Sequence, residues 1–484
     1  MSSIPKINQL PGELLVLIYA TGLRDSPSNQ HQPFLASICS VCRHWRDVAI
    51  EASELWTTIY IALGRHLPAT QAFLERSKGR LIDVFITAIN TDRFIIARDA
   101  ATITAITALH ISRVRTLVMS LPQYKVYTTF SDAYRSISAT NLAGLSFHCS
   151  RDIWQFGAIP PLFANADSLC HLDTQGIFLN IVPSRTSLTS LELDNYMPTH
   201  KELQGLFDSS PRLETLILHA FDILGPRELV SEADVKPMTI TAPTSFTALA
   251  LNLHRRHSDS TTSCCVLGSL RIPNLEYLEL VGSSVLDIDI DLKVHFGQLD
   301  KLRKLRIQHC TVSPPDEEFL LSLKELRRLE LVDMSPEDIR HIIAPPSSSF
   351  SFPRLSSVFF SRTGGRIFSP YRLLQLAQRC VAAGCPRFTL EVEKGSSGEN
   401  FKGISESCFQ DGRIRVIESD CSSGLIRQDD AETDSSVVWD EGETDVEGWE
   451  VYEFEDDEWD EDEEDASEGD EEDQDGDLLA VYST

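Results

Sequence analysis

The sequence lacks the features of membrane and secreted proteins. No segment reaches the roughly 18 uninterrupted apolar residues of a membrane-spanning helix, and Glu13 interrupts the apolar run near the N-terminus. The eleven cysteines have no even spacing, which favours a reducing compartment over a disulfide framework. These absences predict a cytoplasmic or nuclear protein with no signal peptide and no membrane partner.

Catalytic and metal-binding motifs are also missing. There is no nucleophile elbow, phosphate-binding glycine loop or HExxH sequence. Cys39, Cys42 and His44 resemble part of a zinc site, but no second ligand pair lies at a matching spacing and a closed zinc site needs four ligands. The alternate aspartates of Asp287–Asp291 lack the glycine and distal glutamate of a calcium loop, so we interpret them as a solvated strand face. We expect no metal, no cofactor and no enzymatic activity.

Basic residues are absent from the C-terminal end. Residues 429–484 hold 28 of the 72 acidic residues and neither Lys nor Arg, which leaves 44 acidic against 43 basic residues in the remainder. The nearly neutral body lacks the clustered basic excess of a nucleic-acid-binding surface. Residues 428–484 are too charged to fold, which predicts a disordered acidic tail. Acidic stretches with spaced aromatic residues, here Trp439, Trp449 and Trp459, can dock on basic, partly apolar surfaces. The alternative, which most acidic tails follow, is a tail that only solubilises the protein.

Apolar residues are plentiful near the N-terminus, where they recur at helical spacing. Leu14, Leu15 and Ile18 follow Pro11, which can occupy the first turn of a helix. After a polar loop, a second set forms one apolar stripe on a helix or on a broken helix pair. This stripe consists of Leu35, Ile38, Val41, Cys42, Trp45 and Ala49. The pattern predicts a small helical bundle.

Three short motifs in this bundle, taken together and in order, resemble the F-box. They are Leu10-Pro11-x-Glu13-Leu14, Ile38-x-x-Val41-Cys42-x-x-Trp45-Arg46 and Leu55-Trp56-x-x-Ile59. The resemblance implies a three-helix F-box-like domain at residues 5–60 that binds a Skp-type adaptor and, through it, a cullin. The residues that it implies for this contact are Leu10, Pro11, Glu13, Leu14, Ile18, Leu35, Ile38, Val41, Cys42, Trp45, Arg46, Leu55 and Trp56. The alternative is a bundle that only caps the domain behind it.

A second pattern, apolar-x-x-apolar-x-apolar, recurs between residues 114 and 360. Its copies begin at Val114, Leu142, Leu169, Leu188, Leu213, Phe246, Leu275, Leu302, Leu326 and Leu355, with advances of 19 to 33 residues. This resembles the leucine-rich repeat, whose period is about 20–29 residues. The resemblance implies an α/β solenoid over residues 61–427, because strands of this kind bury their apolar face only by stacking on neighbours.

Between the copies, periodicity predicts further elements. The expected helices are Pro68–Ser77, Lys201–Ser209, Pro336–Ile343 and Tyr371–Ala383, the first ending at Lys78-Gly79 because glycine tolerates a helix C-terminal cap. The expected strands outside the copies are Leu81–Ile86, Phe388–Val392 and Arg413–Ile417. Polar insertions at Val230–Thr244 and His254–Ser263 are either binding loops on one face or disordered surface loops. The predicted fold class is therefore α+β or α/β.

Two functional hypotheses follow. The resemblance implies a substrate-recognition subunit of a Skp–cullin–F-box ubiquitin ligase, whose repeats bind an unknown protein substrate while other subunits transfer ubiquitin. The alternative is a non-ligase scaffold or chaperone-like binder of basic proteins that acts through the acidic tail.

Overall fold

We describe the protein from a computed structural model. It describes residues 10–27, 30–63, 68–88, 93–121, 123–149, 160–182, 184–194, 199–222, 239–254, 270–282, 289–290, 299–312, 322–343, 352, 354–361, 370–382, 385, 387–393, 414–419 and 424–426. The chain divides into two units, residues 1–432 and 433–484, and every described residue belongs to the first. The predicted acidic tail with its three Trp therefore lies outside the described residues.

The described part mixes helices and strands, as the predicted fold class requires. The α-helices are α1 (Gly12–Asp25), α2 (His31–Val41), α3 (Arg43–Glu51), α4 (Pro68–Arg76), α5 (Arg93–Ala108), α6 (Tyr124–Tyr134), α7 (His200–Ser209), α10 (Pro336–Ile343) and α11 (Pro370–Ala382). Short 3-10 helices are η3 (Ser53–Trp56), η4 (Ile111–Arg113) and η6 (Gly176–Ile181). Among these residues, no helix combines the length and apolar character needed to cross a membrane.

Among the described residues, fourteen strands form one sheet, and their order in the sheet is the same as their order along the chain. They are β1 (Thr58–Leu63), β2 (Ile82–Ala88), β3 (Val114–Leu121), β4 (Gly144–Cys149), β5 (His171–Gln175), β6 (Ser190–Asp194), β7 (Thr215–Asp222), β9 (Ala248–His254), β11 (Tyr277–Val281), β13 (Lys304–Gln308), β15 (Arg328–Val332), β16 (Ser357–Ser361), β17 (Phe388–Glu393) and β18 (Ile414–Ser419). Every pair is parallel. A parallel sheet is consistent with the α/β expectation.

Two small parallel pairs accompany the large sheet. They join β8 (Ile240–Thr241) to β10 (Leu270–Arg271) and β12 (Asp289–Ile290) to β14 (Thr311–Val312). β8 lies inside the first predicted insertion, which is therefore not entirely a polar loop. The second insertion lies outside the described residues except for His254, the last residue of β9.

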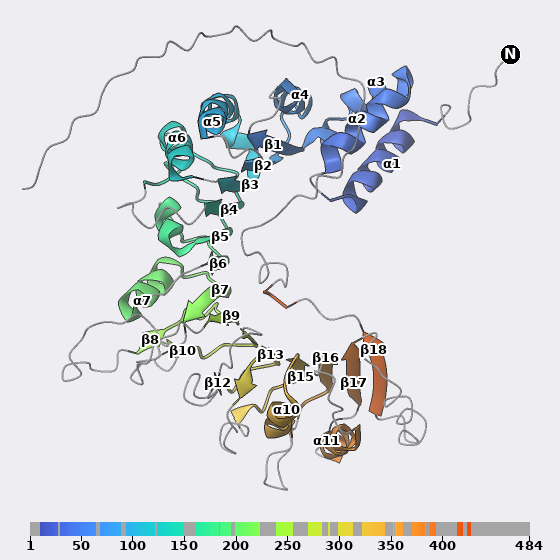
Figure 1. Cartoon of the computed structure of the whole chain (residues 1–484), viewed down its shortest axis with the longest axis vertical. Coiled ribbons are helices and arrows are strands. Elements are labelled where there is room, and N and C mark those ends of the chain that lie inside the picture. Colours follow the sequence, from blue (N-terminus) through green and yellow to red (C-terminus); the bar gives the residue numbers. More distant parts are fainter. Residues whose placement is uncertain are drawn as a thin grey trace, which may run out of the picture. The chain divides into compact units, whose positions relative to one another are not determined.

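Each copy of the apolar pattern coincides with a strand of the large sheet. Its second and third positions point to one face, as Leu278 and Leu280 do on β11. Its first position lies in the turn before the strand, except in the first copy, where Val114 is the first residue of β3. All ten first positions are buried, with 0–2% exposure. Helices cover the same face, and Figure 1 shows α4, α5, α6 and α7 on one side of their neighbouring strands. One hydrophobic core runs from Leu15 to Val392.

The predicted helices are present with small shifts of their ends. α7 begins after Thr199, whose side chain accepts from the N–H of Glu202 while the Glu202 carboxylate accepts from the Thr199 N–H. This capping box fixes the start of the helix. The sequence did not point to α5 and α6, which occupy the same layer. The structure also corrects the prediction for Pro11. This residue precedes α1 as its N-terminal cap residue and does not occupy the first turn.

Candidate interaction surfaces

The apolar stripe that the sequence placed on a helix or on a broken helix pair is divided between two helices, α2 and α3. Cys42 has extended backbone angles, φ −162° and ψ 170°, and separates α2 from α3. The guanidinium of Arg46 donates from Nε to the carbonyl of Cys39 at 2.9 Å and bridges this break. Tyr19 of α1 packs its ring against Trp45 of α3 at 5.6 Å between centroids. The three helices therefore form a closed bundle.

The predicted adaptor residues divide into a buried and an exposed group. The buried ones are Leu35, Ile38, Leu55 and Trp56, each at most 5% exposed. Half-buried ones are Leu10, Cys42 and Trp45, and the exposed ones are Pro11, Glu13, Leu14, Ile18, Val41 and Arg46. The buried members shape the bundle and have little surface left for a partner, so a direct contact is restricted to the other two groups.

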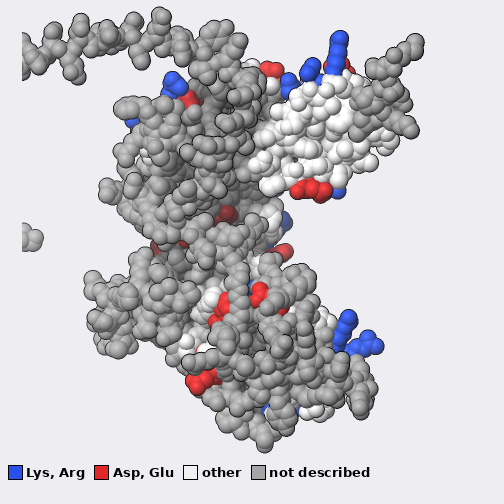
Figure 2. Space-filling view, turned by 45° about the vertical axis from the view of Figure 1, so that its right-hand side comes forward, with Lys and Arg blue, Asp and Glu red and all other residues white. Residues whose placement is uncertain are grey.

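Exposed apolar side chains are concentrated on this bundle. Of the six large hydrophobic side chains that are exposed within the described residues, four belong to α1 and α2: Leu14 (46%), Leu17 (60%), Ile18 (49%) and Val41 (55%). We call these four residues the apolar helix set. Figure 2 shows a broad uncharged surface over the N-terminal helices. Leu17 was missed from the sequence, although its spacing of three residues from Leu14 places both on one helical face.

The bundle is attached to the first strand of the sheet. Gln32 of α2 donates to the carbonyl of Tyr60 in β1 at 2.7 Å. The indole of Trp56 donates to the carbonyl of Ala49 at 2.7 Å, and the guanidinium of Arg76 lies 4.4 Å from the Trp56 ring centroid. The bundle therefore also covers the end of the sheet, which is the role that the capping alternative assigned to it.

Comparison with known families agrees with the three motifs. A family model described as F-box-like matches residues 7–62. This segment is an F-box-like domain. The match spans α1, α2, α3, η3 and most of β1, so the F-box-like domain contains the apolar helix set. Among curated proteins, no match to the chain was found.

The sheet face opposite the helices carries a continuous row of side chains, which we call the open-face row. Strand register aligns one residue from each of the fourteen strands: Tyr60, Phe85, Val118, Ser146, Asp173, Glu192, Ile217, Ala250, Glu279, Arg306, Glu330, Phe359, Glu391 and Ile417. From β1 to β6 these residues are half-buried, whereas those from Ile217 to Phe359 are buried. The accessible part of the row is therefore its N-terminal half.

A serine, a histidine and an aspartate meet on β4 and β5. Asp173 Oδ2 accepts from Ser146 Oγ at 2.7 Å and lies 3.0 Å from His148 Nε2. Burial would lower the pKa of His148, but the hydrogen bond and charge of Asp173 outweigh it and raise that pKa. Burial would raise the pKa of Asp173, but His148 outweighs it and lowers that pKa. The serine contacts the carboxylate rather than the imidazole, so this is not the arrangement of a nucleophilic triad.

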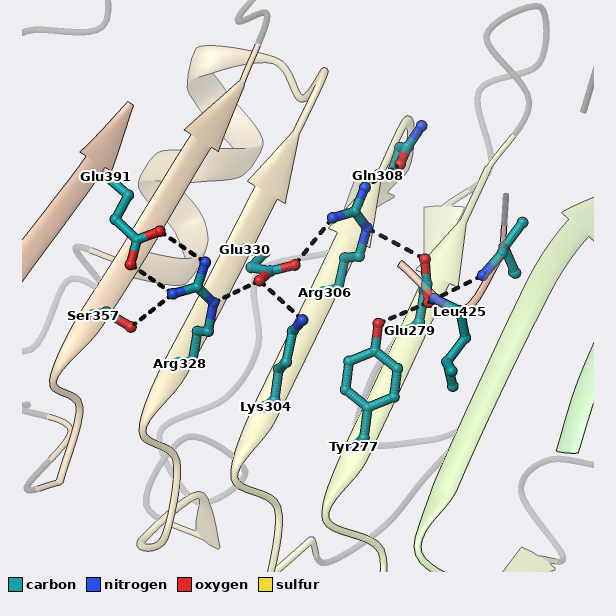
Figure 3. A network of polar contacts seen from close by, with 11 residues as sticks. Tyr277, Glu279, Lys304, Arg306, Gln308, Arg328, Glu330, Ser357, Glu391 and Leu425 are labelled. Atoms are coloured by element: carbon teal, nitrogen blue, oxygen red, sulfur yellow. Dashed lines mark hydrogen bonds and ion pairs between the residues drawn. The ribbon is translucent and has the colours of Figure 1, made fainter. Parts of the chain in front are cut away.

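The C-terminal half of the face carries a charge network (Figure 3). It balances three carboxylates with three cations: Glu279, Glu330, Glu391, Lys304, Arg306 and Arg328. Arg328 holds Glu391 through two hydrogen bonds, and Arg306 bridges the fully buried Glu279 and Glu330 at 3.2 Å and 3.0 Å. Burial would raise the pKa of Glu330, but Arg328 and Lys304 outweigh it and lower that pKa.

Those candidate metal ligands that the structure describes are not gathered into a site. Within the described residues, no group of three or more His, Cys, Asp or Glu side chains could hold a metal ion. Cys39 and Cys42 are free thiols. Of the three alternate aspartates, Asp289 lies on β12, while Asp287 and Asp291 lie outside the described residues.

Proposed function

We propose that the chain is an F-box protein that recruits target proteins to a Skp–cullin–F-box ubiquitin ligase. The observation that carries this proposal is the F-box-like domain at residues 7–62 together with the apolar helix set on its surface. F-box domains generally bind Skp1-type adaptors. Four exposed aliphatic side chains are a suitable core for such a contact, because interface cores are depleted of charge and rich in apolar groups.

The sheet is proposed to be a degenerate leucine-rich-repeat solenoid that binds the target. The support is the arrangement of one strand for each copy of the apolar pattern, and a sheet face that carries the open-face row and on which no helix lies within the described residues. On this proposal the protein is not an enzyme and works in the cytoplasm or nucleus. It supplies proximity between target and ligase, while other subunits perform ubiquitin transfer.

Co-purification with a Skp-type adaptor tests the adaptor contact. Leu14→Asp combined with Val41→Asp places two charges in the proposed contact, and we expect adaptor recovery to fall at least about tenfold, which corresponds to about 1.4 kcal/mol. Leu109→Asp is the matched control, because Leu109 is 80% exposed outside the F-box-like domain. Equal recovery by the double variant and the control would refute the proposed contact. Capture of an adaptor without a cullin would favour a scaffold outside the ligase.

A further inference from the structure

A three-residue segment beyond the last strand lies on the open face of the sheet. The N–H of Leu425 donates to Oε2 of Glu279 at 2.6 Å, and the N–H of Ile426 donates to the same oxygen at 3.4 Å. The Tyr277 hydroxyl also donates to this oxygen, at 2.7 Å (Figure 3). Two successive backbone N–H groups therefore converge on one carboxylate, an arrangement that proteins use to bind anions.

Side chains of the segment fit the surface around Glu279. Ile426 is 4% exposed and forms an apolar cluster with Ile217, Ala250 and Val281, against which Leu425 packs. These three sheet residues come from β7, β9 and β11, so the segment crosses adjacent strands. Burying aliphatic side chains in this way contributes about 25 cal/mol for each Å² removed from water.

Gly424 is required by the same geometry. A Cβ atom on Gly424 would overlap the carboxylate of Glu279. The surface thus accepts a particular pattern, a glycine followed by two aliphatic residues, whose backbone N–H groups meet the carboxylate. Glu279 is fully buried, and its charge is balanced from the other side by Arg306 at 3.2 Å.

We propose that Ile217, Ala250, Glu279 and Val281 form a docking surface for a target segment with this glycine–aliphatic–aliphatic pattern, and that residues 424–426 occupy it in cis. The inference rests on the proposed function, in which the open face receives targets. A tethered segment has an effective concentration in the millimolar range. A target must therefore outcompete it, for example by also contacting the half-buried part of the open-face row, and the cis segment acts as a specificity filter.

Gly424→Val tests whether the cis segment occupies the surface. Its side chain has no room beside Glu279, so the segment should leave without any change to the sheet. Hydrogen exchange of the full chain should show protected amides at Leu425 and Ile426, with protection lost in the variant. Gly79→Val is the control, because a Cβ at Gly79 meets nothing within 4 Å. Freely exchanging amides in the unmodified chain would overturn the proposal.

Peptide binding tests whether the surface accepts the pattern in trans. The probe is a fluorescent peptide with the sequence of residues 422–428, SSGLIRQ, and fluorescence polarisation measures its binding to the full chain. We expect the Gly424→Val chain to bind it at least about tenfold more tightly than the unmodified chain, because the cis competitor is gone. A peptide with Val in place of its glycine should not bind. Ile426→Asp is a second way of releasing the segment and should give the same gain.

Absence of peptide binding to both released variants, with unchanged thermal unfolding, would show that the surface is not a docking site. Exchange of the segment between two copies would appear as a doubled mass in light scattering, and would refute occupation in cis. Adaptor co-purification of the same variants reports on the F-box-like domain alone. Loss of adaptor binding with intact peptide binding would therefore count against the proposed function and not against this surface.

Discussion

Single residues decide how closely neighbouring turns approach in this protein. Gly282 follows β11, and a Cβ there would overlap the carbonyl oxygen of His309, whose own φ is 50°. The end of α4 differs from the prediction: Lys78 and not Gly79 takes the left-handed conformation, with φ 52°. The ammonium of Lys78 donates to the carbonyl of Glu51 at 3.3 Å, a contact that glycine cannot make.

Gly282→Ala should destabilise the sheet. The new methyl group would meet backbone atoms, which cannot move aside like a flexible side chain, and overpacking of this kind costs about 1–3 kcal/mol. Chemical denaturation of the full chain measures the effect. Gly205→Ala in α7 is the matched control, since its Cβ meets nothing within 4 Å and alanine favours a helix by up to about 1 kcal/mol. Equal stability of the two variants would contradict the prediction.

The pair of His148 and Asp173 should make stability depend on pH. The folded-state pKa of His148 is raised. The stability that His148 contributes to the fold is therefore complete below the unfolded pKa of about 6.5 and is lost as pH rises through the folded pKa. The folded-state pKa of Asp173 is lowered. The stability that Asp173 contributes to the fold is therefore complete above about pH 4 and is lost as pH falls through the folded pKa. The pair therefore stabilises most between about pH 4 and 6.5.

Thermal unfolding at several pH values checks this expectation. The melting temperature of the unmodified chain should fall relative to that of His148→Gln between about pH 6 and 8. Charged neighbours on the same face include Glu192, Asp194 and His219, and the variant leaves all three in place. A constant difference between the two chains over this range would show that the pair contributes no pH-dependent stability.

Some helices of this protein have clear local signals in the sequence, whereas others do not. α7 has a capping box and a regular apolar face of Leu203, Leu206 and Phe207, and both signals are local. α5 is rich in β-branched residues and alanine, so its sequence shows no clear apolar stripe that would predict the buried side. α5 packs against α6, and a hydrogen bond between the Thr107 and Tyr134 hydroxyls joins the two helices.

Removing the capping box tests the contribution of local signals. Thr199→Ala leaves the N–H of Glu202 without its acceptor and should cost about 1 kcal/mol. Thr102→Ala is the control, because this exposed threonine lies within α5 and its hydroxyl donates to the carbonyl of Arg98 in the same helix at 3.3 Å. We expect that change to stay within about 0.5 kcal/mol. Urea denaturation measures the free energy of unfolding of both variants. An equal loss of stability in the two would show that the capping box contributes no more than an ordinary helix hydrogen bond.

The described part of the first unit contains one large sheet and one large hydrophobic core. The core continues from Leu15 in α1 to Val392 in β17 without a boundary among the described residues. Each strand covers the apolar row of the strand before it. We therefore expect residues 81–392 to unfold as a single cooperative solenoid rather than as two domains.

Leu278→Asp tests cooperativity at the centre of the sheet. Leu278 is fully buried, and an unpaired carboxylate there should cost several kcal/mol. Hydrogen exchange should then accelerate in both β1–β6 and β13–β17. Leu109→Asp supplies the same chemical change at an exposed position and should leave exchange unchanged. Loss of protection confined to the strands beside β11 would show that the sheet unfolds in independent parts.

The sequence by itself determined the periodic features of this protein. The strands that begin after Leu142 or Leu302 and the helices α7, α10 and α11 follow from local periodicity, because 2-residue and 3.6-residue repeats are fixed by backbone geometry. The F-box motifs located a domain that the family comparison also found. These signals lie within short stretches of chain, so they can be recognised without knowing which elements pack against each other.

Only the tertiary structure decided which of those residues are exposed and which are buried. It buried Leu35 and Ile38 while it exposed Leu17, and it joined Gly424–Ile426 to Glu279 across 146 residues of sequence. It also aligned the charges of Glu279, Arg306 and Glu330, which come from three separate strands, β11, β13 and β15. Strand register and long-range packing bring such residues together, and neither leaves a regular spacing in the sequence.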